Sequence, residues 1–288
     1  MVPPDIWSIG IYTGPSPLAL HPAPAARNPV LTAALVTDMP ATFVADPFLL
    51  YRPPTWYMFF EVMHGPWNRG VIGLATSPDG WHWHYDRVVL QEAFHLSYPY
   101  VFAWQGAYYM VPETLEAEAI RLYQATHFPY EWTYVSALLP GRYADPSLFQ
   151  ADGLWWMFVC PTPFTHDTLA LYYADTLHGP WVPHPQNPLM QHDAQRARPG
   201  GRVTRLGERL LRYAQDDAPY YGRQVRAFDI TTLTTTHYAE QEIATSPILQ
   251  PSGTGWNAKG MHHVDPHCLS ATCWLASVDG HYANPTAP

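Results

Sequence analysis

Short runs of apolar and aromatic residues recur along almost the whole chain, and within many of them apolar and polar positions alternate. Such a period of two is typical of β-strands that bury one face. Turn residues separate the runs, and the 31 prolines interrupt any longer helical period. The pattern therefore predicts an all-β protein built from many short strands.

Three segments of the chain share one four-strand pattern. Each opens with a proline and an apolar strand, followed by a turn, an aromatic strand that contains Met, a third strand, and a fourth strand that follows a Trp. The opening prolines, Pro47, Pro99 and Pro146, lie 52 and 47 residues apart. Four-stranded units of about 50 residues in series are typical of β-propeller blades. The first two strands of the copies read ADPFLLYRPPTWYMFFEV, SYPYVFAWQGAYYMVPET and ADPSLFQADGLWWMFVCP.

Two fainter copies extend the series to five. The fourth opens at Pro199, 53 residues after Pro146, and the fifth supplies only two strands. We expect the apolar N-terminal segment to complete the fifth sheet and to close the ring without a covalent bond. A many-stranded β-sandwich is the alternative, but it gives no reason for a serial repeat. The sequence thus predicts one five-bladed β-propeller domain over 1–288, with four-stranded antiparallel blades at about 42–92, 93–140, 141–190, 195–245, and 258–282 plus 5–20.

Composition narrows the class of partner. Aromatic residues make up 15% of the chain and charged residues only 14%. This balance suits strands, and it also suits carbohydrate binding, because flat rings stack on the apolar face of a sugar. We expect the larger share of the rings to pack in the core. The net charge of −9 and the lack of a basic stripe argue against a nucleic-acid partner.

Several other classes of protein are disfavoured. No run of about 18 apolar residues exists, so no membrane span is expected. The N-terminus lacks the basic and apolar regions of a secretory signal, which favours a cytoplasmic location. Cys268 and Cys273 could pair across a short turn, but free thiols are the expectation for these two and for Cys160. No zinc, calcium-loop or phosphate-loop spacing occurs, so no metal or other cofactor is expected.

The predicted fold brings polar side chains from different blades to one place. The first strand of a blade lines the channel and the second runs antiparallel to it, so the start of one and the end of the other meet at the same mouth. First strands begin near Asp46, Tyr98, Asp145, Arg198 and His262 or His263, and second strands end near Glu61, Glu113, Cys160, Gln215 with Asp216, and Asp279. We expect five carboxylates to converge on one rim beside Arg198, namely Asp46, Glu61, Glu113, Asp145 and Asp216.

Clustered carboxylates push one another's pKa values apart. A protonated carboxyl beside an ionised one is what cleavage of a glycosidic bond requires. Each residue also has a structural interpretation. An Asp before Pro often caps a turn, Glu61 and Glu113 could be solvated strand ends, and Arg198 could either neutralise the ring or grip a ligand. His262 and His263 are expected to be hydrogen-bonding residues of the channel rather than metal ligands, and Tyr98 and Trp104 to be stacking platforms or core.

The motifs ADPF, FFE, HLSYPYVF, YMVPET, ADPSLF, ARPGGR and AQD together resemble the N-terminal propeller of plant glucosamine inositolphosphorylceramide transferases and their bacterial homologues. HLSYP with VPET is the most specific part, and the resemblance runs from about Ile6 to Gly280. That group is itself similar to five-bladed glycoside hydrolases of families 43 and 32. In the plant transferases the transferase chemistry resembles a separate domain, which we do not find in this chain.

The resemblance to family 43 implies roles for individual residues. It implies that Asp46 is the general base and that Asp145 tunes the acid or binds substrate. Glu113 is the best match to the general acid, and Glu61 is the second choice. The remaining candidates, which the blade alignment brings to the same mouth, are expected to bind substrate: Glu61, Tyr98, Arg198, Gln215, Asp216, His262 and His263.

This sequence departs from the hydrolase pattern at two positions. Tyr98 stands where those hydrolases have a second-blade Asp, and Cys160 stands where the third blade supplies their acid. The first hypothesis is a glycoside hydrolase that cleaves a terminal glycosidic bond. The alternative is a non-catalytic glycan-binding propeller, accessory to a glycosyltransferase. A third hypothesis is a scaffold that binds proteins through its outer blade edges.

Overall fold

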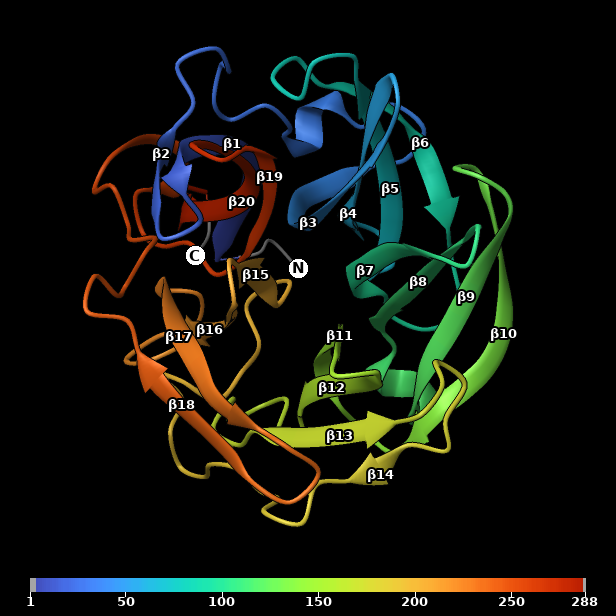
Figure 1. The fold of residues 1–288 in the computed structure, drawn as a ribbon. Coiled ribbons are helices and arrows are strands. Elements are labelled where there is room, and N and C mark those ends of the chain that lie inside the picture. Colours follow the sequence, from blue (N-terminus) through green and yellow to red (C-terminus); the bar gives the residue numbers. More distant parts are fainter. Residues whose placement is uncertain (1–3, 287–288) are drawn as a thin grey trace.

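The computed structural model describes residues 4–286, which form five four-stranded antiparallel sheets arranged radially around a channel (Figure 1). Each of the first two blades runs outward in chain order from the channel to the rim. Blade one contains β3 (Ala41–Arg52), β4 (Thr55–His64), β5 (Arg69–Ser77) and β6 (His84–Leu90). Blade two contains β7 (Ser97–Trp104), β8 (Ala107–Glu113), β9 (Ala119–His127) and β10 (Glu131–Pro140).

Each of the next two blades contains one very short strand, of two residues in β14 and three in β15. Blade three contains β11 (Ala144–Ala151), β12 (Leu154–Cys160), β13 (Ala170–Ala174) and β14 (Val182–Pro183). Blade four contains β15 (Thr204–Leu206), β16 (Arg209–Asp216), β17 (Gln224–Leu233) and β18 (Tyr238–Glu242). The all-β, five-bladed fold predicted from the sequence is therefore confirmed.

The fifth blade joins the two ends of the chain. Its strand order is β19 (Val264–Ser270), β20 (Cys273–Ala283), β1 (Asp5–Ser16) and β2 (Ala19–Pro22). The β1 strand pairs with β20 without a break from Asp5 opposite Ala283 to Gly14 opposite Trp274. Figure 1 shows the blue β1 beside the red β20. The N-terminal segment completes the last blade, as predicted, and hydrogen bonds close the ring.

The Trp that recurs before the fourth strand of the sequence repeat is buried and fixes a turn. In each of the first three blades an indole N–H donates to a backbone carbonyl in the turn before the fourth strand. Trp83 donates to Gly80 at 2.9 Å, Trp132 to Pro129 at 2.9 Å and Trp181 to Leu177 at 3.2 Å. All three rings are buried. A large apolar ring with one satisfied polar group fills the space at this turn and fixes the turn's geometry.

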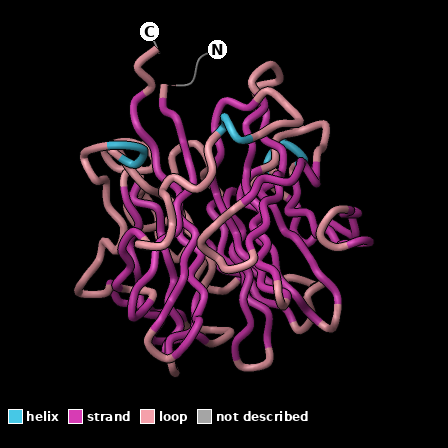
Figure 2. The backbone as a smooth tube through the Cα atoms, turned by 90° about the horizontal axis from the view of Figure 1, so that it is seen from above, coloured by secondary structure: helices cyan, strands magenta, loops and turns pink. Residues whose placement is uncertain are grey.

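One end of the propeller carries the irregular structure. Both described ends of the chain and the three 3₁₀ helices lie there (Figure 2), and so do the ends of the second strands. The helices are η1 (Ala33–Leu35), η2 (Leu115–Ala117) and η3 (Gly255–Asn257). Within residues 4–286 no helix is long and apolar enough to cross a membrane. We call this end the mouth.

The first strands of blades one to three share a distorted start. Asp46, Tyr98 and Asp145 have φ angles of 53°, 46° and 51°, in the left-handed region that side chains rarely adopt. At the same three places the pairing with the second strand shifts register. Such bulges re-aim side chains and backbone groups next to functional sites. Here they place three equivalent backbone N–H groups where a carboxylate of the preceding blade accepts from each.

Candidate active site at the mouth of the channel

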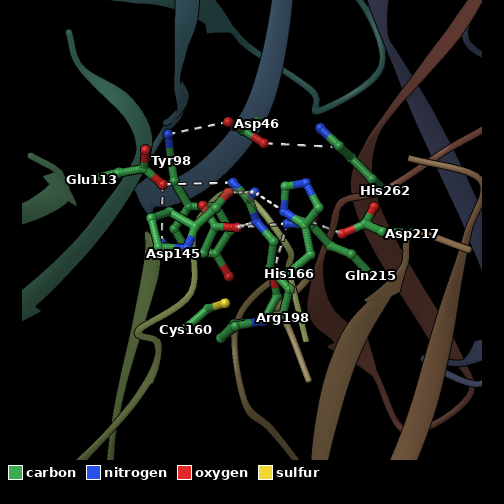
Figure 3. Close-up of polar contacts among 12 residues, drawn as sticks. Asp46, Tyr98, Glu113, Asp145, Cys160, His166, Arg198, Gln215, Asp217 and His262 are labelled. Carbon is green, nitrogen blue, oxygen red and sulfur yellow. Dashed lines mark hydrogen bonds and ion pairs between the residues drawn. The ribbon is translucent and has the colours of Figure 1, made fainter. Parts of the chain in front are cut away.

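Carboxylates at the mouth link each blade to the next through backbone N–H groups. Asp279 Oδ2 accepts a hydrogen bond from the N–H of Asp46 at 3.0 Å, and Asp46 Oδ2 accepts one from Tyr98 at 3.2 Å. Glu113 Oε2 accepts one from Asp145 at 3.2 Å (Figure 3). Every donor in this series is a bulge residue with a positive φ. The series joins blades five, one, two and three, so these carboxylates hold blades together as well as forming a site.

Arg198 lies at the centre of the acidic cluster (Figure 3). Its Nε donates to Asp145 Oδ2 at 2.5 Å, and its Nη2 is 3.6 Å from Glu113 Oε2. Gln215 Nε2 also donates to Asp145 Oδ2, at 2.7 Å. All four side chains are buried. Because buried carboxylates are costly without a partner, Arg198 is the cation that makes this cluster tolerable.

His262 supplies a second positive charge. Its Nδ1 is 2.9 Å from Asp279 Oδ2 and 3.9 Å from Asp46 Oδ1. Burial opposes the charged form of the ring, but the Asp279 carboxylate outweighs burial and raises the pKa of His262 to about 9. Burial likewise disfavours ionised Asp279, and the charge of His262 lowers its pKa to about 2. The two residues therefore form a buried ion pair at neutral pH.

Three other carboxyl groups have raised pKa values, so their neutral forms are favoured. Burial, reinforced by the Asp145 carboxylate, raises the pKa of Glu113 to about 8. Burial raises the pKa of Asp46 to about 7, although the charge of His262 acts in the opposite direction. Glu61 has a pKa well above its usual value, first through burial and then through the charge of Asp46. At neutral pH Glu113 is mostly protonated while Asp46 is partly ionised, so two neighbouring blades offer a proton donor and a proton acceptor.

The structure brings most of the expected site residues together, but the surroundings of Glu61, Tyr98 and His263 differ. Glu61 lies 3.4 Å from His95 Nε2, and its Oε1 has no hydrogen-bond partner among the described residues. Tyr98 is not exposed as a stacking platform: its ring is buried and its hydroxyl accepts from the N–H of Gly201 at 2.7 Å. His263 is buried with its ring edge-on to those of Phe48 and Tyr98.

Asp216 and Trp104 turn away from the cluster. Asp216 Oδ2 accepts from Gln224 Nε2 at 2.6 Å and from Arg226 Nε at 2.9 Å, so this carboxylate ties β16 to β17 within blade four. Side chains alternate along a strand, and Gln215 is the one that faces Asp145. Trp104 packs against Trp155, with ring centroids 5.6 Å apart, as core. Cys160 is a buried thiol, and all three cysteines are free, as expected.

Sequence reasoning missed three residues that border the cluster. His166 Nδ1 accepts from Arg198 Nη1 at 2.7 Å, and burial lowers the pKa of this ring to about 4, so it is neutral. Asp217 Oδ2 is buried without a hydrogen-bond partner among the described residues, 3.9 Å from His166. Burial raises the pKa of Asp217 to about 6. The ring centroid of Tyr221 is 5.4 Å from the Arg198 guanidinium.

One set of side chains within the described residues is close enough to hold a metal ion. The donor atoms of Asp46, His262 and Asp279 lie within 4.8 Å of one another. These atoms already serve other partners, because Asp279 bonds to the ring of His262 and accepts from the backbone N–H groups of His262, His263 and Asp46. We therefore assign the three residues to the hydrogen-bond network described above.

The fold is shared with carbohydrate-active enzymes of low sequence identity. The catalytic domain of a family 62 α-L-arabinofuranosidase from Coprinopsis cinerea matches with a TM-score of 0.63 at 12% identity, over 93% of this chain and 97% of that one. A thermostable family 43 glycoside hydrolase matches with a TM-score of 0.60 at 16% identity, over 82% and 84% of the two chains. At such identities the similarity establishes the architecture alone.

Sequence comparison is more specific. Glucosamine inositolphosphorylceramide transferase 1 of Oryza sativa subsp. japonica is 38% identical over 297 residues, which cover 95% of this chain. The match takes in only 40% of that relative's length. A family model described as glucosamine inositolphosphorylceramide transferase 1, N-terminal, matches residues 4–281. The chain therefore belongs to the family of glucosamine inositolphosphorylceramide transferase 1 N-terminal domains.

Proposed function

We propose that this propeller is a glycoside hydrolase that cleaves a terminal glycosidic bond at its mouth. The observation that carries the proposal is the placement of Glu113 and Asp46 on neighbouring blades around Arg198. Their pKa values, raised to about 8 and about 7, suit an acid that is protonated and a base that is ionised near neutral pH. The shared architecture with family 43 and family 62 hydrolases supports the same assignment.

The proposed reaction needs one proton donor and one acceptor. Glu113 donates its proton to the glycosidic oxygen as the bond between that oxygen and the anomeric carbon breaks. Asp46 removes a proton from the water molecule that attacks the anomeric carbon from the opposite face, which is the inverting course. Two protons and one water are thereby accounted for, and the products are a free sugar and an alcohol.

The cations beside the cluster support this chemistry. Arg198 Nη2, 3.6 Å from Glu113 Oε2, stabilises the carboxylate that forms when Glu113 has given up its proton. His262, 3.9 Å from Asp46 Oδ1, favours the ionised form of the base. Asp145 acts by positioning Arg198, because its Oδ2 is already occupied by Arg198 and Gln215.

A second candidate function is a glycan-binding module that serves a transferase. Two observations favour it. The chain corresponds to two fifths of a relative that is named a transferase, and Tyr98 replaces the carboxylate that hydrolases of this type have in blade two. In this case the carboxylates would accept hydrogen bonds from sugar hydroxyls and hold the blades together, without turnover.

Product release from a panel of glycosides separates the two functions. The panel includes glucosaminides, because the relatives are named for glucosamine. Wild-type protein should release sugar, Asp46→Asn should not, and Glu113→Gln should retain activity only on dinitrophenyl glycosides, whose leaving group needs no acid. Asp229→Asn, at a half-buried residue paired with exposed Arg209 away from the mouth, is the matched charge control. Stoichiometric binding with no product from any member would establish the binding module instead.

A further inference from the structure

Exposed aromatic rings surround the acidic mouth. The loops between the second and third strands of blades one, three and four carry Trp67, Phe164 and Tyr221. These side chains are 49%, 76% and 40% exposed. Single exposed apolar residues are common on proteins and need no explanation. Here, however, three equivalent loops present an aromatic ring at the end of the propeller where the carboxylates converge.

The loop of Phe164 is anchored to the centre of the site. Arg198 Nη1 donates to the carbonyl of Pro163 at 3.4 Å and to His166 Nδ1 at 2.7 Å, on either side of Phe164. Asp167 Oδ1 accepts from the hydroxyls of Thr162 and Thr165 at 2.9 and 2.8 Å, which closes the loop on itself. Phe164 is therefore the exposed member of a braced loop whose base is the Arg198 side chain.

Tyr221 continues this aromatic border into blade four. Its ring lies 5.1 Å from that of His166 and 5.2 Å from that of His262. Trp7 packs against its edge, with ring centroids 6.0 Å apart, and stacks on His262 at 4.0 Å. Phe164 and Tyr221 thus flank the pair formed by His166 and Arg198, on the side of the mouth that blades three and four share.

Trp67 stands on the other side. In a ring of five, blade one faces the junction of blades three and four across the channel (Figure 1). The indole of Trp67 stacks on the ring of His64, with ring centroids 3.9 Å apart and planes inclined by 19°. The backbone N–H of Trp67 also donates to His64 Nδ1, at 3.0 Å. The Arg69 guanidinium also lies over this ring, 5.2 Å from its centroid, so two side chains of the protein hold the indole.

Rings that are held at their base and exposed at their tip are suited to stacking on the apolar faces of sugars. We propose that the mouth binds an oligosaccharide rather than a single sugar, and that Phe164 and Tyr221 stack on the sugar next to the one held by the carboxylates. Trp67 borders the opposite side of the same chain. This inference rests on the proposed carbohydrate function, and it holds for a hydrolase and for a glycan-binding module alike.

Binding measured against chain length tests the inference. Oligosaccharides of glucosamine, glucose, galactose, arabinose and xylose, one to four residues long, are screened on an array, and each series that binds is titrated calorimetrically. For wild-type protein the affinity should rise about tenfold from the monosaccharide to the trisaccharide, the equivalent of 1.4 kcal/mol. Phe164→Ala should lose about that factor for the trisaccharide and less than twofold for the monosaccharide.

Tyr134→Ala is the matched control, because Tyr134 is 46% exposed on β10, the outer strand of blade two. It should bind every chain length as wild type does. An equal dependence on chain length in Phe164→Ala and wild type would overturn the inference while leaving the proposed function intact. The inference would also be overturned, with the proposed function intact, if Phe164→Ala instead lost binding to phosphatidylserine vesicles. The aromatic rings at the mouth would then be assigned to a lipid surface. If no glycan of any length binds to wild-type protein, both proposals fail.

Discussion

The carboxylate of Asp46 accepts a hydrogen bond from the backbone N–H of Tyr98 at 3.2 Å, across the junction of blades one and two. The residue that we propose as the general base is therefore also a tie between blades. Substitutions at Asp46 change stability through one property and chemistry through another: the acceptor oxygen holds Tyr98, whereas the negative charge takes up a proton. Two variants separate these properties.

Asp46→Asn keeps an acceptor oxygen, and Asp46→Ala removes it. We expect Asp46→Asn to unfold in urea within about 1 kcal/mol of wild type, because the N–H of Tyr98 stays satisfied. Asp46→Ala leaves a buried N–H unpaired and should cost about 1–3 kcal/mol more. Both variants should lack turnover. Equal stability of the two variants would show that the Tyr98 hydrogen bond contributes nothing to holding the blades together.

The pH dependence of kcat/KM should be bell-shaped and narrow. Glu113, with its pKa raised to about 8, is protonated below that pH and loses its proton above it, so activity should fall on the alkaline side near pH 8. Asp46, with its pKa raised to about 7, becomes protonated below that pH, so activity should fall on the acid side near pH 7.

A dinitrophenyl glycoside provides the control for this pH profile. In Glu113→Gln the residual activity on this substrate should keep the acid limb and lose the alkaline one. If the alkaline limb persists in Glu113→Gln, a different group titrates there and Glu113 is not the acid.

The sequence repeat predicts the blades because each of the first three blades places similar residues at equivalent positions of its strands and turns. Each bulge residue lies 15 positions before a residue at or near the end of the second strand. This spacing pairs Asp46 with Glu61 and Asp145 with Cys160. The indole of Trp132 and its equivalents mark the same turn in three blades. The N-terminal strand could be assigned because an apolar segment was left over and one sheet lacked two strands.

The misses occur where the repeat ends. Asp216 and Asp217 are adjacent at the end of β16, and there the alternation of side chains decides which one approaches the cluster. Gln215 faces Asp145, so Asp216 turns to Arg226, and Asp217 lies just beyond the strand with no pattern to follow. His166 comes from the loop between β12 and β13, which is longer than the equivalent loops of blades one, two and four. Its place beside Arg198 depends on the path of the loop, which periodicity does not specify.

Arg198 should be the side chain whose loss destabilises the mouth most. Arg198→Met leaves the Asp145 carboxylate buried without its cation, at a cost of about 3–5 kcal/mol in urea unfolding at pH 7.5. Adding Asp145→Asn should recover part of that loss, because one uncompensated charge is removed.

The surface pair of Arg209 and Asp229 on blade four is the control for that cycle. Arg209→Met should cost less than about 1 kcal/mol, because water and salt screen a surface ion pair. Strict additivity of Arg198→Met and Asp145→Asn would contradict the coupling that the 2.5 Å contact between these side chains implies.

Deeper in the channel, Arg202 should make stability depend on pH in the acid range. Its Nε donates to Asp265 Oδ1 at 2.7 Å and its Nη2 to the carbonyl of Val101 at 2.9 Å, while Asp265 Oδ2 accepts from the N–H of Leu49 at 2.6 Å. One ion pair thus connects blades four, five, one and two. Burial alone would raise the pKa of Asp265, but the charge of Arg202 outweighs burial and holds it well below the usual value.

A carboxyl whose pKa is lower in the folded protein stabilises it above the unfolded pKa of about 4, and this contribution is lost as the pH falls toward the folded value. The free energy of unfolding of wild-type protein should therefore decline steeply below pH 4. Asp265→Asn should be less stable at pH 7 and should show a shallower decline between pH 4 and pH 2. Arg202→Met should weaken the same pH dependence, because Asp265 then loses the larger of the two charges that lower its pKa and keeps only that of His267, 3.0 Å away. Parallel declines in wild type and both variants would locate the acid sensitivity elsewhere, with the His262–Asp279 pair as the next group to test.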